Sequence, residues 1–177
     1  MNILVVSSSG RMKGNSDLLC DELIRGAKEK GNIVSKVSLH QLNIHPCKGC
    51  DYCQEHDGCI QDDDMKDLSK VIQNTDVLVM ATPVYFYNLS SSLKLLIDRT
   101  YAFYKKKHFK KTILIATSAD PSPEAMKTTI SGYESYLSCL DGVENLGMIL
   151  AAGVEKMGDV LGHSAFKQAY ELGKSLQ

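Results

Sequence analysis

Short apolar runs alternate with segments of helical spacing along the chain, and this alternation constrains its fold more than any other feature. Apolar runs are typical of parallel strands that helices cover on both faces. They occupy residues 3–6, 77–81, 112–116 and 143–152, and a run at 33–39 alternates apolar and polar side chains. Helices are expected at about 16–30, 62–74, 89–104, 123–140 and 163–176.

Five such βα units predict an α/β fold, a three-layer sandwich in which a five-stranded parallel sheet of order 2-1-3-4-5 carries helices on both faces. The 177 residues form a single domain with no linker or repeat, interrupted by a cysteine-rich loop at about 41–61. A net charge of -1 gives no reason to expect a nucleic acid or a membrane surface as partner. No signal peptide or membrane-spanning run is visible, so we expect a cytoplasmic protein.

Residues 7–16 form a loop rich in Ser, Gly and Asn between the first strand and the first helix. Such a turn directs backbone N–H groups and hydroxyls at one anion, and the helix dipole adds to the attraction. Arg11 supplies a two-pronged cationic donor. The nucleoside-triphosphate and dinucleotide glycine motifs are both absent. The loop therefore predicts a site for a phosphate monoester, and a capped helix without a ligand is the alternative.

The loop at 82–88 follows the third strand and carries Tyr85, Phe86 and Tyr87 in succession after Pro83. Apolar contacts and free backbone groups at such a loop suit a planar aromatic ligand with a polar edge. Core packing of the aromatics is the alternative, but the place of the loop opposite the phosphate loop favours a ligand. The loop at 117–123 meets both of them at one edge of the sheet in the predicted strand order.

Four of the six cysteines crowd into one segment with the spacing Cys47-x2-Cys50-x2-Cys53-x5-Cys59. In a chain of this length we expect reduced thiols or metal ligation rather than disulfides. Three thiolates at two-residue spacing face one concave surface, as a [4Fe–4S] cluster requires, whereas zinc usually takes two separated pairs. Two alternatives remain for this segment: a zinc site, and a reduced or oxidisable thiol loop near the planar aromatic ligand predicted above.

Other residues of the chain have simpler interpretations. His45 and His56 are alternative metal ligands, although a loop histidine more often faces solvent. Cys20 and Cys139 fall in expected helices and are predicted to be small core residues. The acidic triplet at 62–64 is interpreted as capping of the helix that it opens.

Taken together, the motifs resemble the flavodoxin-like family of NAD(P)H-dependent FMN reductases and, within it, the iron–sulfur flavoproteins. Gly10 stands where relatives often carry proline, which loosens the turn without removing a donor. The resemblance covers most of the chain, and its last part is a likeness of Gly153 and Gly158-Asp159 to the final loop of the family. The residues that carry it are Ser9-Gly10-Arg11, Gly14-Asn15-Ser16, Thr82-Pro83-Val84-Tyr85, Leu93-Lys94, Asp98-Arg99 and the four-cysteine segment.

The resemblance implies FMN as cofactor and NAD(P)H as electron donor. It implies that the FMN phosphate binds Ser9, Arg11, Asn15 and Ser16. It also implies that the isoalloxazine contacts two loops, through Pro83, Val84, Tyr85, Phe86, Tyr87 and Asn88 and, on its pyrimidine side, Thr117, Ser118 and Ala119. The family further implies a homodimer or homotetramer.

The function that follows is an FMN-dependent oxidoreductase that takes hydride from NAD(P)H and passes electrons to a quinone-like, small-molecule or protein acceptor. A [4Fe–4S] cluster on Cys47, Cys50, Cys53 and Cys59 would release them singly, to a ferredoxin-like protein among others. A flavodoxin-type electron carrier without its own turnover is the alternative, although the near-neutral charge argues against an acidic docking face. A zinc-stabilised structural domain is the third hypothesis.

Overall fold

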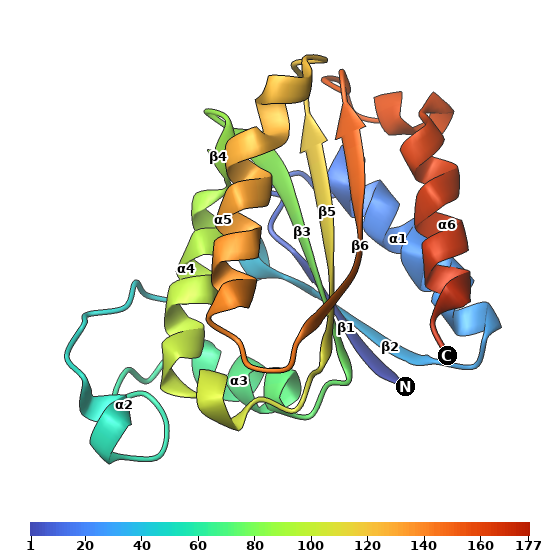
Figure 1. Cartoon of the computed structure of the whole chain (residues 1–177). Coiled ribbons are helices and arrows are strands. Elements are labelled where there is room, and N and C mark those ends of the chain that lie inside the picture. The colour runs from blue at the N-terminus through green and yellow to red at the C-terminus, as the bar shows by residue number, and fades with distance from the viewer.

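A twisted sheet forms the middle layer of the computed structural model, which describes residues 1–177 (Figure 1). Its five parallel strands lie in the order β2-β1-β3-β5-β6. They are β1 (Asn2–Ser7), β2 (Ile33–Ser38), β3 (Val77–Tyr85), β5 (Lys111–Ser118) and β6 (Glu144–Ala152). The additional strand β4 (Asn88–Leu89) pairs only with the end of β3. Without it, the five parallel strands have the predicted order 2-1-3-4-5, and the predicted fold is confirmed.

Helices cover both faces of this sheet (Figure 1). On one face lie α1 (Asn15–Glu29) and α6 (Ser164–Ser175), and on the other α3 (Met65–Gln73), α4 (Ser91–Arg99) and α5 (Lys127–Ser138). A short helix, α2 (Tyr52–Glu55), lies in the cysteine segment away from the sheet. None of the helices combines the length and the hydropathy that a membrane-spanning segment requires.

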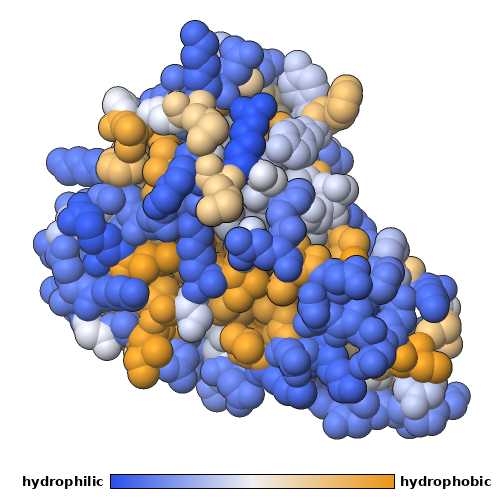
Figure 2. Space-filling view, turned by 180° about the vertical axis from the view of Figure 1, so that it is seen from behind, coloured by the Kyte–Doolittle hydropathy of each residue, from blue (hydrophilic) through white to orange (hydrophobic).

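Alternation along each strand divides the interior into two cores. On β1, Ile3 and Val5 face α1 and α6, whereas Leu4 and Val6 face the opposite helices. The central strands repeat this pattern because successive side chains of a strand point to opposite faces. Burial on both faces explains why these strands are apolar at consecutive positions. On the outer surface, the face shown in Figure 2 is mostly hydrophilic, with hydrophobic residues gathered toward its middle.

The helices α1 and α6 approach each other unusually closely, because a glycine of each lies in the contact. A Cβ atom at Gly26 would overlap the carbonyl oxygen of Tyr170, and one at Gly173 would overlap that of Leu23. Backbone atoms cannot rotate away as a side chain does, so only glycine fits at these two positions.

Three local expectations need correction. The expected helix at 89–104 ends at Arg99 and continues as two 3₁₀ turns. Cys139 is not a core residue, since it follows the last residue of α5 and is exposed, whereas Cys20 is buried as predicted. The acidic triplet does more than cap α3, because Asp63 forms an ion pair with the buried Arg99.

Candidate functional site

A pocket of about 280 Å³ opens at the carboxyl edge of the sheet, where the loops after β1, β3, β5 and β6 meet. Nine of the thirteen predicted cofactor-binding residues line it: Ser9, Arg11, Asn15, Ser16, Pro83, Val84, Tyr85, Thr117 and Ala119. Four lining residues were not among the predicted ones, namely Gly14, Val154, Glu155 and Met157. The glycines at 153 and 158 were the sequence signal for the last of these loops.

The first loop is held in shape by its own serine and by glycine. The Ser9 hydroxyl accepts a hydrogen bond from Arg11 N at 3.2 Å and donates one to Arg11 O at 3.1 Å. A Cβ at Gly14 would lie 3.0 Å from that same carbonyl oxygen, so a side chain does not fit here without a shift. At Gly10 a Cβ would lie 3.2 Å from the His40 ring, so a larger residue there requires this ring to move slightly.

The start of α1 is open toward this pocket. Gly14 is the N-cap residue and no side chain caps the helix, so the N–H groups of its first turn are free to meet an anion. Ser16 is buried at this terminus, and Arg11 is exposed at the pocket and pairs with no carboxylate of the chain. A helix terminus, a hydroxyl and a guanidinium thus face one small space.

Asn15 is a pocket residue, but its side chain is already engaged. Its amide group donates to Lys156 O at 2.9 Å and accepts from Gly158 N at 3.1 Å and Val160 N at 3.3 Å. All of the hydrogen bonds go to the loop after β6. The side chain therefore joins two walls of the pocket rather than presenting its amide to a ligand.

The aromatic loop is the tip of a hairpin between β3 and β4. Phe86 (φ 49°) and Tyr87 (φ 62°) both have left-handed backbone conformations, as the central residues of the tightest hairpin turns do. Pro83, Val84 and Tyr85 line the pocket, whereas Phe86, Tyr87 and Asn88 project beyond it. Core packing, the structural alternative, is thereby excluded for Phe86, which is fully exposed.

A hydrogen bond ties this hairpin to the loop after β5. The Tyr87 hydroxyl donates to Asp120 Oδ2 at 3.0 Å, which raises the pKa of the tyrosine. Hydrogen bonds from Ser122 and from Tyr87 lower the pKa of Asp120. Ser118 does not line the pocket, because its hydroxyl accepts from Asp120 N within this loop.

The cysteine segment projects from the other end of the molecule (Figure 1). The helix α4 marks the separation: its N-cap Ser90 bonds the Ser8 hydroxyl next to the pocket, and its last residue, Arg99, pairs with Asp63 at the base of the segment. Nine helical residues span about 13 Å. The cysteine segment is therefore separated from the edge pocket by the length of this helix.

The four thiols are free, and three of them are exposed. No group of three or more Cys, His, Asp or Glu side chains is arranged to hold a metal ion, so the expected convergence of three thiols on one face is not seen. The donor set nevertheless suits iron, because four unpaired thiols lie within one short segment. A buried donor beside Cys59, the Arg99 Nε, has no hydrogen-bond acceptor and is suited to a sulfur.

The fold is that of α/β proteins with a parallel sheet, which bind their ligands at the carboxyl edge of the strands, where this pocket lies. The sequence matches the family described as NADPH-dependent FMN reductase over residues 1–143, and the chain belongs to that family. The expected class, an NAD(P)H-dependent flavin oxidoreductase, is confirmed by this membership.

Individual relatives with similar sequences or structures are also named as flavoproteins or as an NAD(P)H-dependent oxidoreductase. The chain is 26% identical to an iron–sulfur flavoprotein of Archaeoglobus fulgidus, over 99% of this chain and 79% of the relative. It is 34% identical to an iron–sulfur flavoprotein of Methanocaldococcus jannaschii, over 56% of this chain and 52% of the relative, so the match spans about half of that protein. An NAD(P)H:quinone oxidoreductase from Methanothermobacter marburgensis has the same fold, with a TM-score of 0.78, 16% identity and coverage of 100% and 99%.

Proposed function

We propose that the chain binds FMN in the edge pocket, takes hydride from NAD(P)H and passes electrons to a quinone-like, small-molecule or protein acceptor. The observation that carries the proposal is the pocket itself, which joins an uncapped helix N-terminus and an unpaired arginine to the apolar Pro83 and Val84. Bound FMN supplies the redox chemistry, accepting a hydride and giving up electrons in pairs or singly.

The residues of the chain hold and orient this cofactor. The hydroxyl of Ser16 and the first N–H groups of α1 bind the phosphate, and Arg11 balances its charge. Ser9, whose hydroxyl is bonded to Arg11, shapes the loop around the phosphate. Asn15 acts as a positioning residue, since its amide holds the loop after β6 in place. Pro83, Val84 and Tyr85 contact one side of the ring, and Thr117 and Ala119 its pyrimidine edge.

The phosphate site is tested by comparing FMN with riboflavin, which lacks the phosphate, in fluorescence titrations of the apoprotein. Arg11→Gln removes one charge-assisted contact and weakens FMN binding about tenfold or more, while riboflavin binding stays unchanged. Lys28→Gln, an equal loss of charge at the exposed far end of α1, is the matched control. Equal losses for the two flavins would refute the assignment of the phosphate.

Turnover separates this proposal from the alternatives. Steady oxidation of NAD(P)H by the FMN-loaded protein with a quinone is expected. A protein that binds FMN but turns over only once would be a carrier of the flavodoxin type. A protein that carries zinc and takes up no flavin would be a structural domain.

For the cysteine segment we propose that Cys47, Cys50, Cys53 and Cys59 hold a [4Fe–4S] cluster. The names of the archaeal relatives and the four free thiols support this. Free thiols also suit the reducing cytoplasm in which we place the protein. An exposed segment at the end of α4 is accessible to a protein partner such as a ferredoxin-like carrier.

Anaerobic reconstitution with iron and sulfide tests the cluster. Cys53→Ser is expected to abolish the uptake of iron and the broad absorption of the cluster. Cys139→Ser changes an exposed cysteine outside the segment and should leave both intact. Uptake of zinc in preference to iron, or iron uptake by the Cys53→Ser variant, would contradict the proposal.

A rim of exposed apolar side chains around the edge pocket supports assembly into a homodimer or homotetramer. Met12, Phe86, Met157 and Leu161 are each more than half exposed there. Such a gathering marks an interaction surface, and a second copy of the chain would cover it. Light scattering should show dissociation by Phe86→Asp but not by Val71→Asp, which changes an exposed residue of α3.

A further inference from the structure

Arg99 is a buried cation at the end of α4 that the proposed reaction does not use. Its side chain is 1% exposed and that of its partner Asp63 is 0% exposed. Two hydrogen bonds join them, from Nη1 to Oδ2 at 2.6 Å and from Nη2 to Oδ1 at 3.0 Å. Burying such a pair costs desolvation energy that an apolar pair would not, so stability alone is a weak reason for its presence.

The pair closes the base of the cysteine segment. Arg99 Nη1 also donates to His45 O at 2.6 Å, and Asp63 Oδ2 accepts from His45 N at 2.9 Å. Beside it, Asp64 Oδ2 accepts from Asn43 N at 2.6 Å. His45 precedes Cys47 and Asp63 follows Cys59, so one guanidinium fixes both ends of the segment that carries all four thiols.

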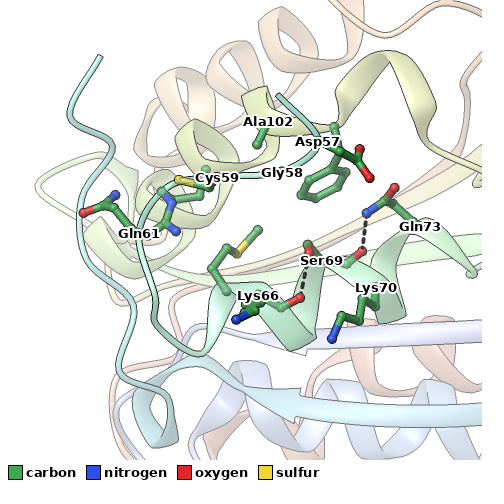
Figure 3. Close-up of a pocket in the computed structure, with 12 residues that line it drawn as sticks. Asp57, Gly58, Cys59, Gln61, Lys66, Ser69, Lys70, Gln73 and Ala102 are labelled. Atoms are coloured by element: carbon green, nitrogen blue, oxygen red, sulfur yellow. Dashed lines mark hydrogen bonds between the residues drawn. The ribbon is translucent and has the colours of Figure 1, made fainter. Parts of the chain in front are cut away.

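Arg99 also lies beside Cys59 and has a donor, Nε, that is free to meet it. Nε is buried and has no hydrogen-bond acceptor, and Arg99 and Cys59 line the same cavity of about 270 Å³. In Figure 3, Cys59 and Gly58 lie on one wall of this cavity and Lys66, Ser69 and Lys70 of α3 on the other. A buried N–H without an acceptor is costly, and an acceptor at this position would recover that cost.

The charges around Arg99 agree with this arrangement. Burial alone would lower the pKa of the guanidinium, but hydrogen bonding and attraction to Asp63, with a smaller contribution from the Cys59 thiol, raise it. Burial would likewise raise the pKa of Asp63, yet the hydrogen bonds from Arg99 and His45 N bring it to about 2. Both members of the pair are therefore charged near neutral pH.

We infer that Arg99 is the positioning residue of the cysteine segment, fixing its two ends through Asp63 and His45 and donating its Nε–H to the sulfur of Cys59. This inference rests on the proposed cluster. A hydrogen bond to a ligand sulfur stabilises the reduced state, so Arg99 also raises the reduction potential of the iron that the segment holds.

The test compares three variants. Arg99→Lys keeps a positive charge but lacks the forked donors. The double variant Arg99→Met/Asp63→Leu replaces the pair by apolar side chains of similar size, which buried pairs tolerate without unfolding. Lys94→Gln breaks the exposed pair between Lys94 and Asp98 on the same helix and is the matched control.

Two measurements are made on each variant. In the apoprotein, the rate of tryptic cleavage after Lys48 reports how firmly the segment is held. After anaerobic reconstitution, the rate of iron loss to a chelator and the reduction potential report the bound state. We expect Arg99→Lys and the double variant to be cleaved and to lose iron at least tenfold faster than the wild type and Lys94→Gln, with a lower potential.

The outcomes separate the inference from the cluster proposal. If the wild type takes up no iron, the cluster proposal fails, and the cleavage rates still decide whether Arg99 holds the segment. The far-UV circular dichroism spectrum shows whether the double variant is folded. If the folded double variant equals the wild type in cleavage rate, iron retention and reduction potential, the inference is overturned. If Arg99→Lys has the same reduction potential as the wild type, the proposed hydrogen bond from Nε to the Cys59 sulfur is refuted, while the fixing of the segment ends is not.

Discussion

Replacing Asn15 by alanine would remove the one side chain that joins the start of α1 to the loop after β6. Three hydrogen bonds would be lost, to Lys156 O, Gly158 N and Val160 N. The loop that these bonds hold contributes Val154, Glu155 and Met157 to the pocket. The substitution therefore tests whether the hydrogen bonds of Asn15 contribute both to the stability of the fold and to FMN binding in the proposed site.

The size of the effect follows from the burial of each partner. The bond to Val160 N is buried, and an N–H left there without an acceptor costs about 1–3 kcal/mol. The other two partners are only partly buried and regain water, so each adds a smaller loss. We expect the free energy of unfolding to fall by about 2–4 kcal/mol. Reordering a loosened loop costs about 1–2 kcal/mol per residue fixed, so FMN binding weakens about tenfold or more.

Urea unfolding of the apoprotein followed by circular dichroism measures the first effect, and quenching of FMN fluorescence measures the second. Asn2→Ala is the control, since Asn2 is exposed and its side chain makes no hydrogen bond. Its backbone N–H donates to Asp76 Oδ2 and its carbonyl oxygen accepts from Asp76 N, and both bonds are kept in the variant. A variant at Asn15 that unfolds within about 0.5 kcal/mol of the wild type, with the same FMN affinity, would refute the reasoning.

Three further predictions concern other parts of the chain. Phe86→Gly should stabilise the monomer by about 1 kcal/mol in urea unfolding, because its φ of 49° is unfavourable for a residue with a Cβ, whereas Phe86→Ala should give no gain. Between pH 4 and pH 2 the free energy of unfolding should fall by about 2 kcal/mol more in the wild type than in Asp63→Asn. The reason is that the Asp63 carboxylate, whose pKa is lowered to about 2 in the folded protein, becomes protonated as the pH falls. Equal losses of stability in the two proteins would contradict this. Gly173→Ala should lower the free energy of unfolding by about 2 kcal/mol or more, whereas Gly162→Ala, which meets no atom within 4 Å, should be neutral; equal stability of the two would show that the helices move apart freely.

Local patterns along the chain predict most of this fold. The consecutive apolar residues of β1, β3 and β5 identify buried parallel strands, and the helix expected at about 16–30 is α1, Asn15–Glu29. The hairpin of β4 could not be predicted, because its turn is formed by Phe86 and Tyr87 rather than by the glycine and asparagine that usually mark one.

The site was predictable where its residues follow strand ends, and not where contacts are distant in sequence. The amide of Asn15 looks like a phosphate ligand until Gly158 and Val160, more than a hundred residues later, are placed against it. In the same way, Asp63 looks like a helix cap because its partner Arg99 is 36 residues away. Long-range polar contacts leave no periodic signal in the sequence.

The close approach of Gly26 and Gly173 has a consequence for how enzymes of this kind diversify. Because the backbones of α1 and α6 touch, the two helices that follow the loops after β1 and β6 are fixed relative to each other. On the other side of the pocket, the hairpin at Phe86 and the loop at Asp120 are joined by one exposed hydrogen bond. If FMN binds as proposed, new electron acceptors would therefore be accommodated by lengthening or reshaping this hairpin and this loop.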